Sequence, residues 1–156
     1  MDESVLRAML KWPDVPAVYG WLALERRGNW LIKKEKIGNA ALRDFISRNY
    51  QADDAGRWYF QNGPQRVYVQ LAYTPLVVRF DQGTLTDHCG SLFHSDGVLL
   101  DDEGSILMSG SRGVGLLDDR DLEKYAAQLG EAVDALPRIA RADVAARFGF
   151  ISDPKP

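Results

Sequence analysis

The sequence contains almost no cysteine: Cys89 is the only one among 156 residues. A single thiol excludes an intramolecular disulfide and suits a reducing compartment. The chain also lacks the run of about 18 consecutive apolar residues that a membrane-spanning helix requires. Its first residues, MDESVLRAMLKWPD, are acidic where a secretory signal would be basic. We therefore expect a cytoplasmic protein.

An excess of basic residues is also missing. Lys and Arg number 19 against 22 Asp and Glu, which gives a formal net charge of −3. General nucleic-acid binders normally carry a basic surface, so this class is excluded. Hydrophobic residues make up 46% of the chain and charged residues 26%, which is typical of a folded globular protein. A chain of this length predicts one compact domain over residues 1–156, or two very small domains that share a core.

What the sequence does contain is an internal repeat. Residues 22–46 and 98–126 each begin with an apolar run, turn at a glycine (Gly28, Gly104), resume with a bulky apolar residue and end in an amphipathic helix. The repeat predicts two half-repeats, about 15–80 and 84–150. Two such halves would face each other, and the seam between them would be the natural place for a ligand.

Hydrophobic periodicity and turn residues predict an α+β fold of antiparallel hairpins, a meander and packed helices. Asn39 is expected to cap a helix, and Asp118 or Asp119 another that continues to Leu136. Trp21, Trp30 and Trp58 are expected in the core. The predicted helices are 4–12, 39–48, 118–136 and 142–148, and the predicted strands are 18–25, 30–33, 57–61, 66–73, 76–80, 98–101 and 105–109, of which 57–80 form the meander.

The meander offers the best candidate ligand surface. Strand alternation can bring its arginines and tyrosines onto one face, where rings stack a base and guanidinium groups hold phosphate. A solvated sheet face or a protein interface has a similar composition. The residues of this face are Arg57, Tyr59, Arg66, Tyr68, Gln70 and Arg79.

A glycine-rich segment, Ser109 to Gly115, follows a predicted strand and precedes a predicted helix. Backbone N–H groups of such a loop can approach a phosphate, and Arg112 could add a charge-assisted hydrogen bond. The lysine of a P-loop is missing, however, and the acidic residues at the start of the next helix would repel an anion. An ordinary connecting loop explains the segment equally well.

The loop from Asp87 to Asp96 gathers both histidines and the cysteine. Such a cluster could bind a metal or activate a thiol, but the spacing matches no zinc site. His88 and Cys89 are neighbours in a strand and are expected to diverge. No catalytic motif occurs elsewhere, so we expect no enzyme, no metal and no cofactor; a hydrolase using this loop stays open as the third alternative.

Residues 22–80 resemble a family of small bacterial proteins that is known only as a domain of unknown function. The similar parts are GNWLIKKEKI with the ALRDFI helix, and GRWYFQNGPQRVYVQLAYTPLVVRF. The resemblance implies two related structural motifs, the later one loosely similar to pleckstrin-homology sheets. It also implies a nucleotide-type ligand between the halves and a role in signal transduction. The chain departs from the family at Leu76 and at residues 62–65, and of these Asn62 and Gln65, with Arg66, are the contacts to test first.

These observations predict a cytoplasmic module that binds a small nucleotide-like anion at the seam between its repeats. Arg66 and Arg79 would pair with phosphate, with Arg112 as a further contact, and Tyr59 or Tyr68 would stack. Asn62 and Gln65 would form hydrogen bonds with the polar edges of the ligand. The alternative is a protein–protein interaction module or a homodimer without a small-molecule ligand.

Overall fold

The computed structural model describes residues 1–156, which divide into two units that are each built on a six-stranded sheet. Unit 1 comprises residues 1–25, 29–72 and 149–156, and unit 2 comprises 26–28 and 73–148. The α+β class is confirmed, and two sheet-and-helix units fit the predicted repeat. None of the helices is long and apolar enough to cross a membrane.

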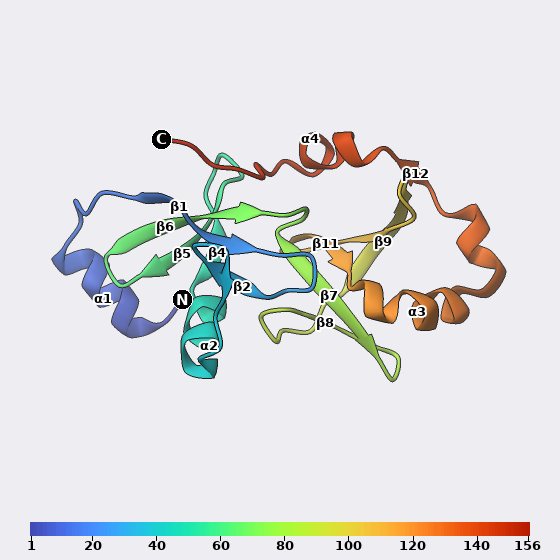
Figure 1. Cartoon of the computed structure of the whole chain (residues 1–156), viewed down its shortest axis with the longest axis horizontal. Coiled ribbons are helices and arrows are strands. Elements are labelled where there is room, and N and C mark those ends of the chain that lie inside the picture. Colours follow the sequence, from blue (N-terminus) through green and yellow to red (C-terminus); the bar gives the residue numbers. More distant parts are fainter. The chain divides into compact units, whose positions relative to one another are not determined.

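Unit 1 contains a sheet in the order β3-β2-β1-β6-β5-β4 (Figure 1). Its strands form an antiparallel β1–β2 hairpin and a β4–β5–β6 meander, which are joined by the parallel pair β1–β6. The elements are α1 (Glu3–Lys11), β1 (Val18–Leu24), β2 (Trp30–Ile32), β3 (Glu35–Lys36), α2 (Ala40–Arg48), β4 (Tyr50–Ala52), β5 (Trp58–Asn62) and β6 (Gln65–Leu71).

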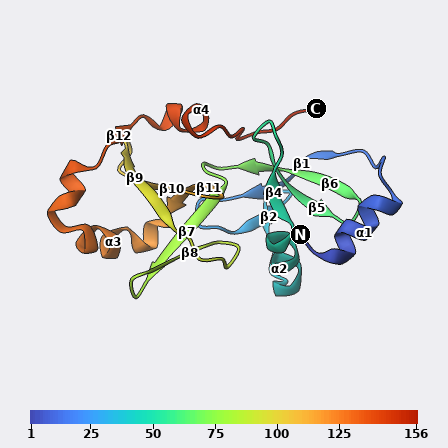
Figure 2. The same cartoon turned by 180° about the vertical axis from the view of Figure 1, so that it is seen from behind.

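Helix α2 covers one face of this sheet. It begins as predicted at Asn39, whose side chain accepts a hydrogen bond from the Leu42 amide. Phe45 packs edge-on against Phe60 of β5, with ring centroids 5.6 Å apart. On the same face, the β2 residue Trp30 donates its indole N–H to Ser47. Figures 1 and 2 show α2 beside β2 and β4, while α1 lies near the β5–β6 turn.

Unit 2 contains a sheet in the order β12-β9-β10-β11-β7-β8. The predicted hairpin of residues 98–109 is confirmed as β9–β10. Helix α3 packs on the sheet through Tyr125, whose ring meets Phe80 edge-on at 5.2 Å. The elements are β7 (Leu76–Asp81), β8 (Thr84–Asp87), β9 (Ser95–Asp101), β10 (Ile106–Gly110), β11 (Gly113–Leu117), α3 (Leu122–Leu129), β12 (Arg138–Ile139) and α4 (Val144–Phe148), with short 3₁₀ turns at Asp119–Asp121, Gly130–Ala135 and Arg141–Asp143.

Three features of the fold differ from the prediction. The meander consists of β4, β5 and β6. Residues 76–81 instead pair parallel with β11 in unit 2, because the chain bends at residues 72–75 without forming a hairpin turn between β6 and β7. Helix α2 ends at Arg48 as predicted, but Tyr50 begins β4, a strand that was not predicted. Helix α3 ends at Leu129, since Gly130 adopts a positive φ of 59° that ends the α-helical run.

Candidate ligand-binding site

The sheet face of unit 1 opposite α2 carries paired aromatic and polar residues. The β5–β6 register places Tyr59 opposite Tyr68 and Gln61 opposite Arg66, so all four side chains share one face. The Arg66 guanidinium lies 3.9 Å from the centroid of the Tyr59 ring and 3.3 Å from the Tyr68 hydroxyl. This part of the predicted arginine–tyrosine surface therefore exists as a local cluster.

The two tyrosines of this cluster are buried, and their contacts are already occupied. Tyr68 is 3% exposed, stacks on Tyr19 with centroids 4.8 Å apart, and has the Arg57 guanidinium 4.7 Å from its ring centre. Its hydroxyl donates to Asp53. Burial opposes ionisation of Asp53, but hydrogen bonds from the backbone and side chain of Arg57 lower its pKa. Tyr59 and Tyr68 therefore hold Arg66 in place and offer no free ring face.

A groove of about 610 Å³ opens beside this cluster, between α1 and the end of the sheet at the β5–β6 turn. We call it the α1 groove. Only Val5 of α1 is buried, so the rest of the helix leaves its apolar side chains available along the groove. The lining residues are Leu6, Met9, Leu10, Trp12, Pro13, Val15, Ala17, Gln61, Pro64, Arg66 and Tyr68.

Gln61 supplies the most specific polar feature of the α1 groove. Its side chain is 2% exposed, and its Nε2 donates to the Gly63 carbonyl at 3.1 Å. Its Oε1 is a buried acceptor without a hydrogen-bond partner. Leaving such an acceptor unsatisfied costs about 1–3 kcal/mol. Gln61 lines the groove, so a ligand N–H or O–H would recover this energy once the side chain turns its Oε1 toward the groove.

Arg66 is the cation of the α1 groove. Arg57, Arg79 and Arg112 are each held by a carboxylate, at 2.6–2.9 Å. Arg66 instead contacts Tyr59 and Tyr68 and forms no ion pair. Burial opposes its charge, but the hydrogen bond with the Tyr68 hydroxyl raises its pKa, so it is a cation at every physiological pH.

Trp12 lines the groove with an exposed aromatic ring. Its side chain is 56% exposed, and Leu6 and Leu10 of the neighbouring helix are 48% and 85% exposed. In the predicted helix 4–12, Trp12 would follow Val5 by seven residues and so lie on the same stripe. The helix ends at Lys11 before the Trp12-Pro13 junction, so the Trp12 ring leaves that stripe. The Trp-Pro pair itself was the signal that could have indicated this.

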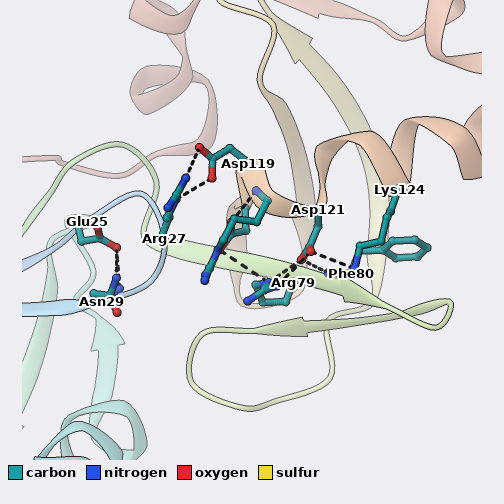
Figure 3. A network of polar contacts seen from close by, with 10 residues as sticks. Glu25, Arg27, Asn29, Arg79, Phe80, Asp119, Asp121 and Lys124 are labelled. Carbon is teal, nitrogen blue, oxygen red and sulfur yellow. Dashed lines mark hydrogen bonds and ion pairs between the residues drawn. The ribbon is translucent and has the colours of Figure 1, made fainter. Parts of the chain in front are cut away.

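The other predicted contacts lie elsewhere. Asn62 and Gln65 pair with each other in the β5–β6 register, and alternation turns them to the α2 face. Arg79 belongs to unit 2, where it binds Asp121 through Nε at 2.6 Å and Nη2 at 3.1 Å (Figure 3). Arg112 also belongs to unit 2 and donates to the buried Asp87 at 2.9 Å.

The glycine-rich segment is not a loop and forms no phosphate cradle. It makes the tight β10–β11 hairpin, with Gly110 opposite Gly113. A Cβ at Gly110 would lie 2.9 Å from the Phe93 ring, and one at Gly115 would lie 2.5 Å from the Val78 side chain. Close packing explains these two glycines.

In the loop after β8, no group of three or more His, Cys, Asp or Glu side chains comes together. Contrary to the expected divergence, Cys89 Sγ lies 3.7 Å from His88 Nε2. His88 Nδ1 accepts a hydrogen bond from the Val77 amide, so the neutral ring carries its proton on Nε2. Burial lowers the pKa of His88 to about 3. The imidazole is therefore a donor toward the sulfur and not a base that could activate it.

The architecture defines a two-unit α+β protein, and solved structures share it. A DUF1285 family protein from Silicibacter pomeroyi DSS-3 matches with a TM-score of 0.58 and 18% identity over 84% of this chain and 80% of its own. A DUF1285 family protein from Shewanella baltica OS155 matches with a TM-score of 0.54 and 18% identity, over 70% of this chain and 92% of its own. At this identity the similarity concerns the fold alone.

Residues 1–155 match the model of the family DUF2944, described as "Protein of unknown function (DUF2946)". The chain therefore belongs to this family. Curated proteins give no significant match. Membership of a family of unknown function is what the sequence resemblance implied, whereas the pleckstrin-homology likeness and the nucleotide ligand stay predictions.

Proposed function

We propose that unit 1 binds a small anionic molecule with a flat ring system, such as a mononucleotide, in the α1 groove. The observation that carries this proposal is the unpartnered Gln61 Oε1, a buried acceptor on the wall of a groove of about 610 Å³. The proposal keeps the ligand class expected from the sequence and assigns it to a groove within one unit.

Three lining residues supply the contacts that such a ligand needs. Trp12 offers an exposed aromatic face for stacking. Gln61 Oε1 accepts a hydrogen bond from a ring or exocyclic N–H. Arg66, held by two tyrosines and free of any carboxylate, pairs with the phosphate. A role in signal transduction would follow if binding changes a partner's affinity for the protein.

Calorimetric titration with adenosine and guanosine monophosphates, their cyclic forms and the parent nucleosides tests the proposal. Arg66→Gln should lower the affinity for the nucleotides at least 10-fold and leave the affinity for the nucleosides nearly unchanged. Trp12→Ala should lower the affinity for both nucleotides and nucleosides. Arg43→Gln, an exposed arginine on α2 that does not line the groove, is the matched control. A ligand at 100 times its Kd should also raise the unfolding free energy by about 2.7 kcal/mol.

Absence of heat and of thermal stabilisation with every nucleotide would refute the nucleotide proposal. Equal affinity of Arg66→Gln and the unaltered chain would refute the assignment to this groove.

A second candidate function, association with another protein or a second copy, is favoured by the exposed apolar side chains of α1. Leu6, Leu10 and Trp12 are 48%, 85% and 56% exposed and line one side of the α1 groove. Exposed apolar patches of this kind often mark interfaces. Light scattering across a 100-fold concentration range tests it: the average mass should rise, and Leu10→Gln should prevent the rise. A constant monomer mass would exclude self-association.

A further inference from the structure

A second groove, of about 370 Å³, lies on the α2 face of the unit 1 sheet. We call it the α2 groove. Its floor is buried, since Leu22 and Ile46 are 2% and 1% exposed, whereas Trp21 and Leu42 at its lip are 50% and 38% exposed. The lining residues are Val18, Trp21, Leu22, Ile32, Leu42, Ile46, Phe60, Asn62, Gln65 and Val67.

A β-bulge in β1 places Trp21 at this groove. Val18 pairs with Val67 and Leu22 with Val69, so four residue steps along β1 face two along β6. Gly20 absorbs the extra length with a φ of +77°. Ordinary alternation would put Trp21 and Leu22 on opposite faces, but both line the groove. Bulges that redirect a side chain in this way are common next to functional sites.

A strained turn places a cation beside Trp21. Lys33 and Lys34 connect β2 and β3 with φ values of 49° and 71°, a conformation that normally selects glycine or asparagine. The Lys33 amide donates to the Trp21 carbonyl at 3.0 Å, which ties the turn to the bulge. The Lys33 ammonium lies 4.2 Å from the centroid of the Trp21 ring. Strain of this kind persists where the surrounding structure enforces it, often at ligand sites.

The lining of the groove itself is uncharged, and its rim carries Lys33 beside Trp21 and Glu35 opposite Ile32. The lining contains no acidic residue, and its polar members, Asn62 and Gln65, are neutral amides. Lys33 adds a positive charge at the lip, although the whole chain has a net charge of −3. An apolar floor with a cation at one edge is complementary to an alkyl chain that ends in an anion.

We infer that the α2 groove binds a single-chain alkyl carboxylate, that is, a medium-chain fatty acid. The chain lies against Leu22, Ile46 and Phe60, and the carboxylate meets the Lys33 ammonium beside Trp21. The site is independent of the α1 groove, because alternation along β6 puts Gln65 and Val67 on one face and Arg66 and Tyr68 on the other.

Calorimetry with octanoate, decanoate and dodecanoate, each below its micelle concentration, tests the inference. Each added pair of methylenes should tighten binding about 15-fold until the groove is filled, which corresponds to about 1.6 kcal/mol. Leu42→Gln should lower the affinity for decanoate at least 10-fold. Lys33→Gln should lower the affinity for decanoate but not the affinity for decanol. Leu92→Gln, which alters a 63% exposed leucine outside the groove, is the matched control and should bind as the unaltered chain does.

Several results would overturn the inference. They are an affinity independent of chain length, equal decanoate binding by Leu42→Gln and Leu92→Gln, or a dimer that Leu42→Gln dissociates in the absence of alkanoate binding. The last would assign the groove to a second copy of the chain. Arg66→Gln should leave decanoate binding intact, so failure of the nucleotide site and failure of this site are distinguishable.

Discussion

Replacing Asp121 by asparagine should destabilise unit 2 strongly. The Asp121 side chain is 1% exposed and accepts hydrogen bonds from Arg79 Nε and Nη2 and from the Phe80 amide, with the Lys124 ammonium 3.3 Å away (Figure 3). The asparagine side chain would keep one carbonyl oxygen and turn an N–H₂ group toward these donors. Loss of a charge-assisted hydrogen bond costs about 1.5–3 kcal/mol. Because Arg79 is 45% exposed and can regain water, we expect a total of about 2–3 kcal/mol.

The effect should depend on pH in a defined direction. Hydrogen bonding to Arg79 lowers the pKa of Asp121 in the folded protein, whereas an aspartate in the unfolded chain titrates near pH ~3.9. The unfolded state therefore binds a proton at a higher pH than the folded state, and the stabilisation is complete above that value and lost below it. The difference between Asp121→Asn and the unaltered chain should be constant from pH 5 to 8 and shrink below about pH 4.

Urea denaturation at a series of pH values measures this difference. Asp119→Asn is the matched control, because Asp119 lies two residues away, pairs with Arg27, and has a side chain that is 67% exposed. Exposed ion pairs contribute little, so this variant should unfold nearly as the unaltered chain does. A loss for Asp121→Asn no larger than that of the control, or a difference that grows toward low pH, would refute the reasoning.

Three further predictions concern packing, turn strain and a buried histidine. Gly115→Ala should cost about 1–3 kcal/mol in thermal unfolding, because the new methyl would press on Val78; an unchanged melting temperature would contradict this. Replacing Lys33-Lys34 by Asn-Gly should raise the unfolding free energy by about 1–2 kcal/mol by relieving two positive φ angles; a loss of stability would show that the turn is not strained. The ring signals of His88 in NMR spectra should not titrate between pH 8 and 4, because burial lowers its pKa to about 3, and a midpoint near 6.5 would contradict the structure. Below about pH 6.5 the His88 imidazole binds a proton in the unfolded chain but not in the folded one. The free energy of unfolding should therefore also fall as the pH drops from about 6.5.

Local sequence patterns predicted the elements whose ends are fixed by their own residues. Asn39 caps α2 through a side-chain hydrogen bond, and the hairpin β9–β10 follows from alternation around a glycine turn. Alternation allowed Arg66, Tyr59 and Tyr68 to share one face, and the β5–β6 register of the structure brings them together there. These features depend on neighbours in the chain, and such neighbours are visible in a sequence.

Pairings between distant segments could not be read in the same way. The parallel pairs β1–β6 and β7–β11 join strands that are far apart in the chain. A hint existed in Leu76, Val77 and Val78, which are all buried, because a continuous apolar run is typical of a strand covered on both faces. The Thr-Pro pair before it was interpreted as a turn, and this interpretation assigned the strand to the wrong sheet.

In the candidate sites, too, local features could be predicted from the sequence, whereas contacts between distant residues could not. Arg66 was identified from strand alternation, but its freedom from carboxylates depends on where Asp53, Asp87 and Asp121 lie in space. The acidic residues near α3 were explained as helix caps, and Asp118 does cap the first turn by accepting from the Arg120 amide. Asp121, three residues on, is instead the centre of a buried ion-pair network. Periodicity does not distinguish these roles, because both use an aspartate in the same turn.

The discontinuous make-up of unit 1 has a consequence for its biogenesis. Residues 149–156 belong to this unit, and within it the Leu71 amide donates to the Ser152 carbonyl and the Ile151 amide to that of Gly56. A ribosome therefore completes all of residues 73–148 before it releases the segment that closes the earlier sheet. Until then the Leu71 amide and the Gly56 carbonyl of unit 1 can bond only to water. A stop codon at residue 149 should therefore leave a protein in which proteases attack the first half and not the last.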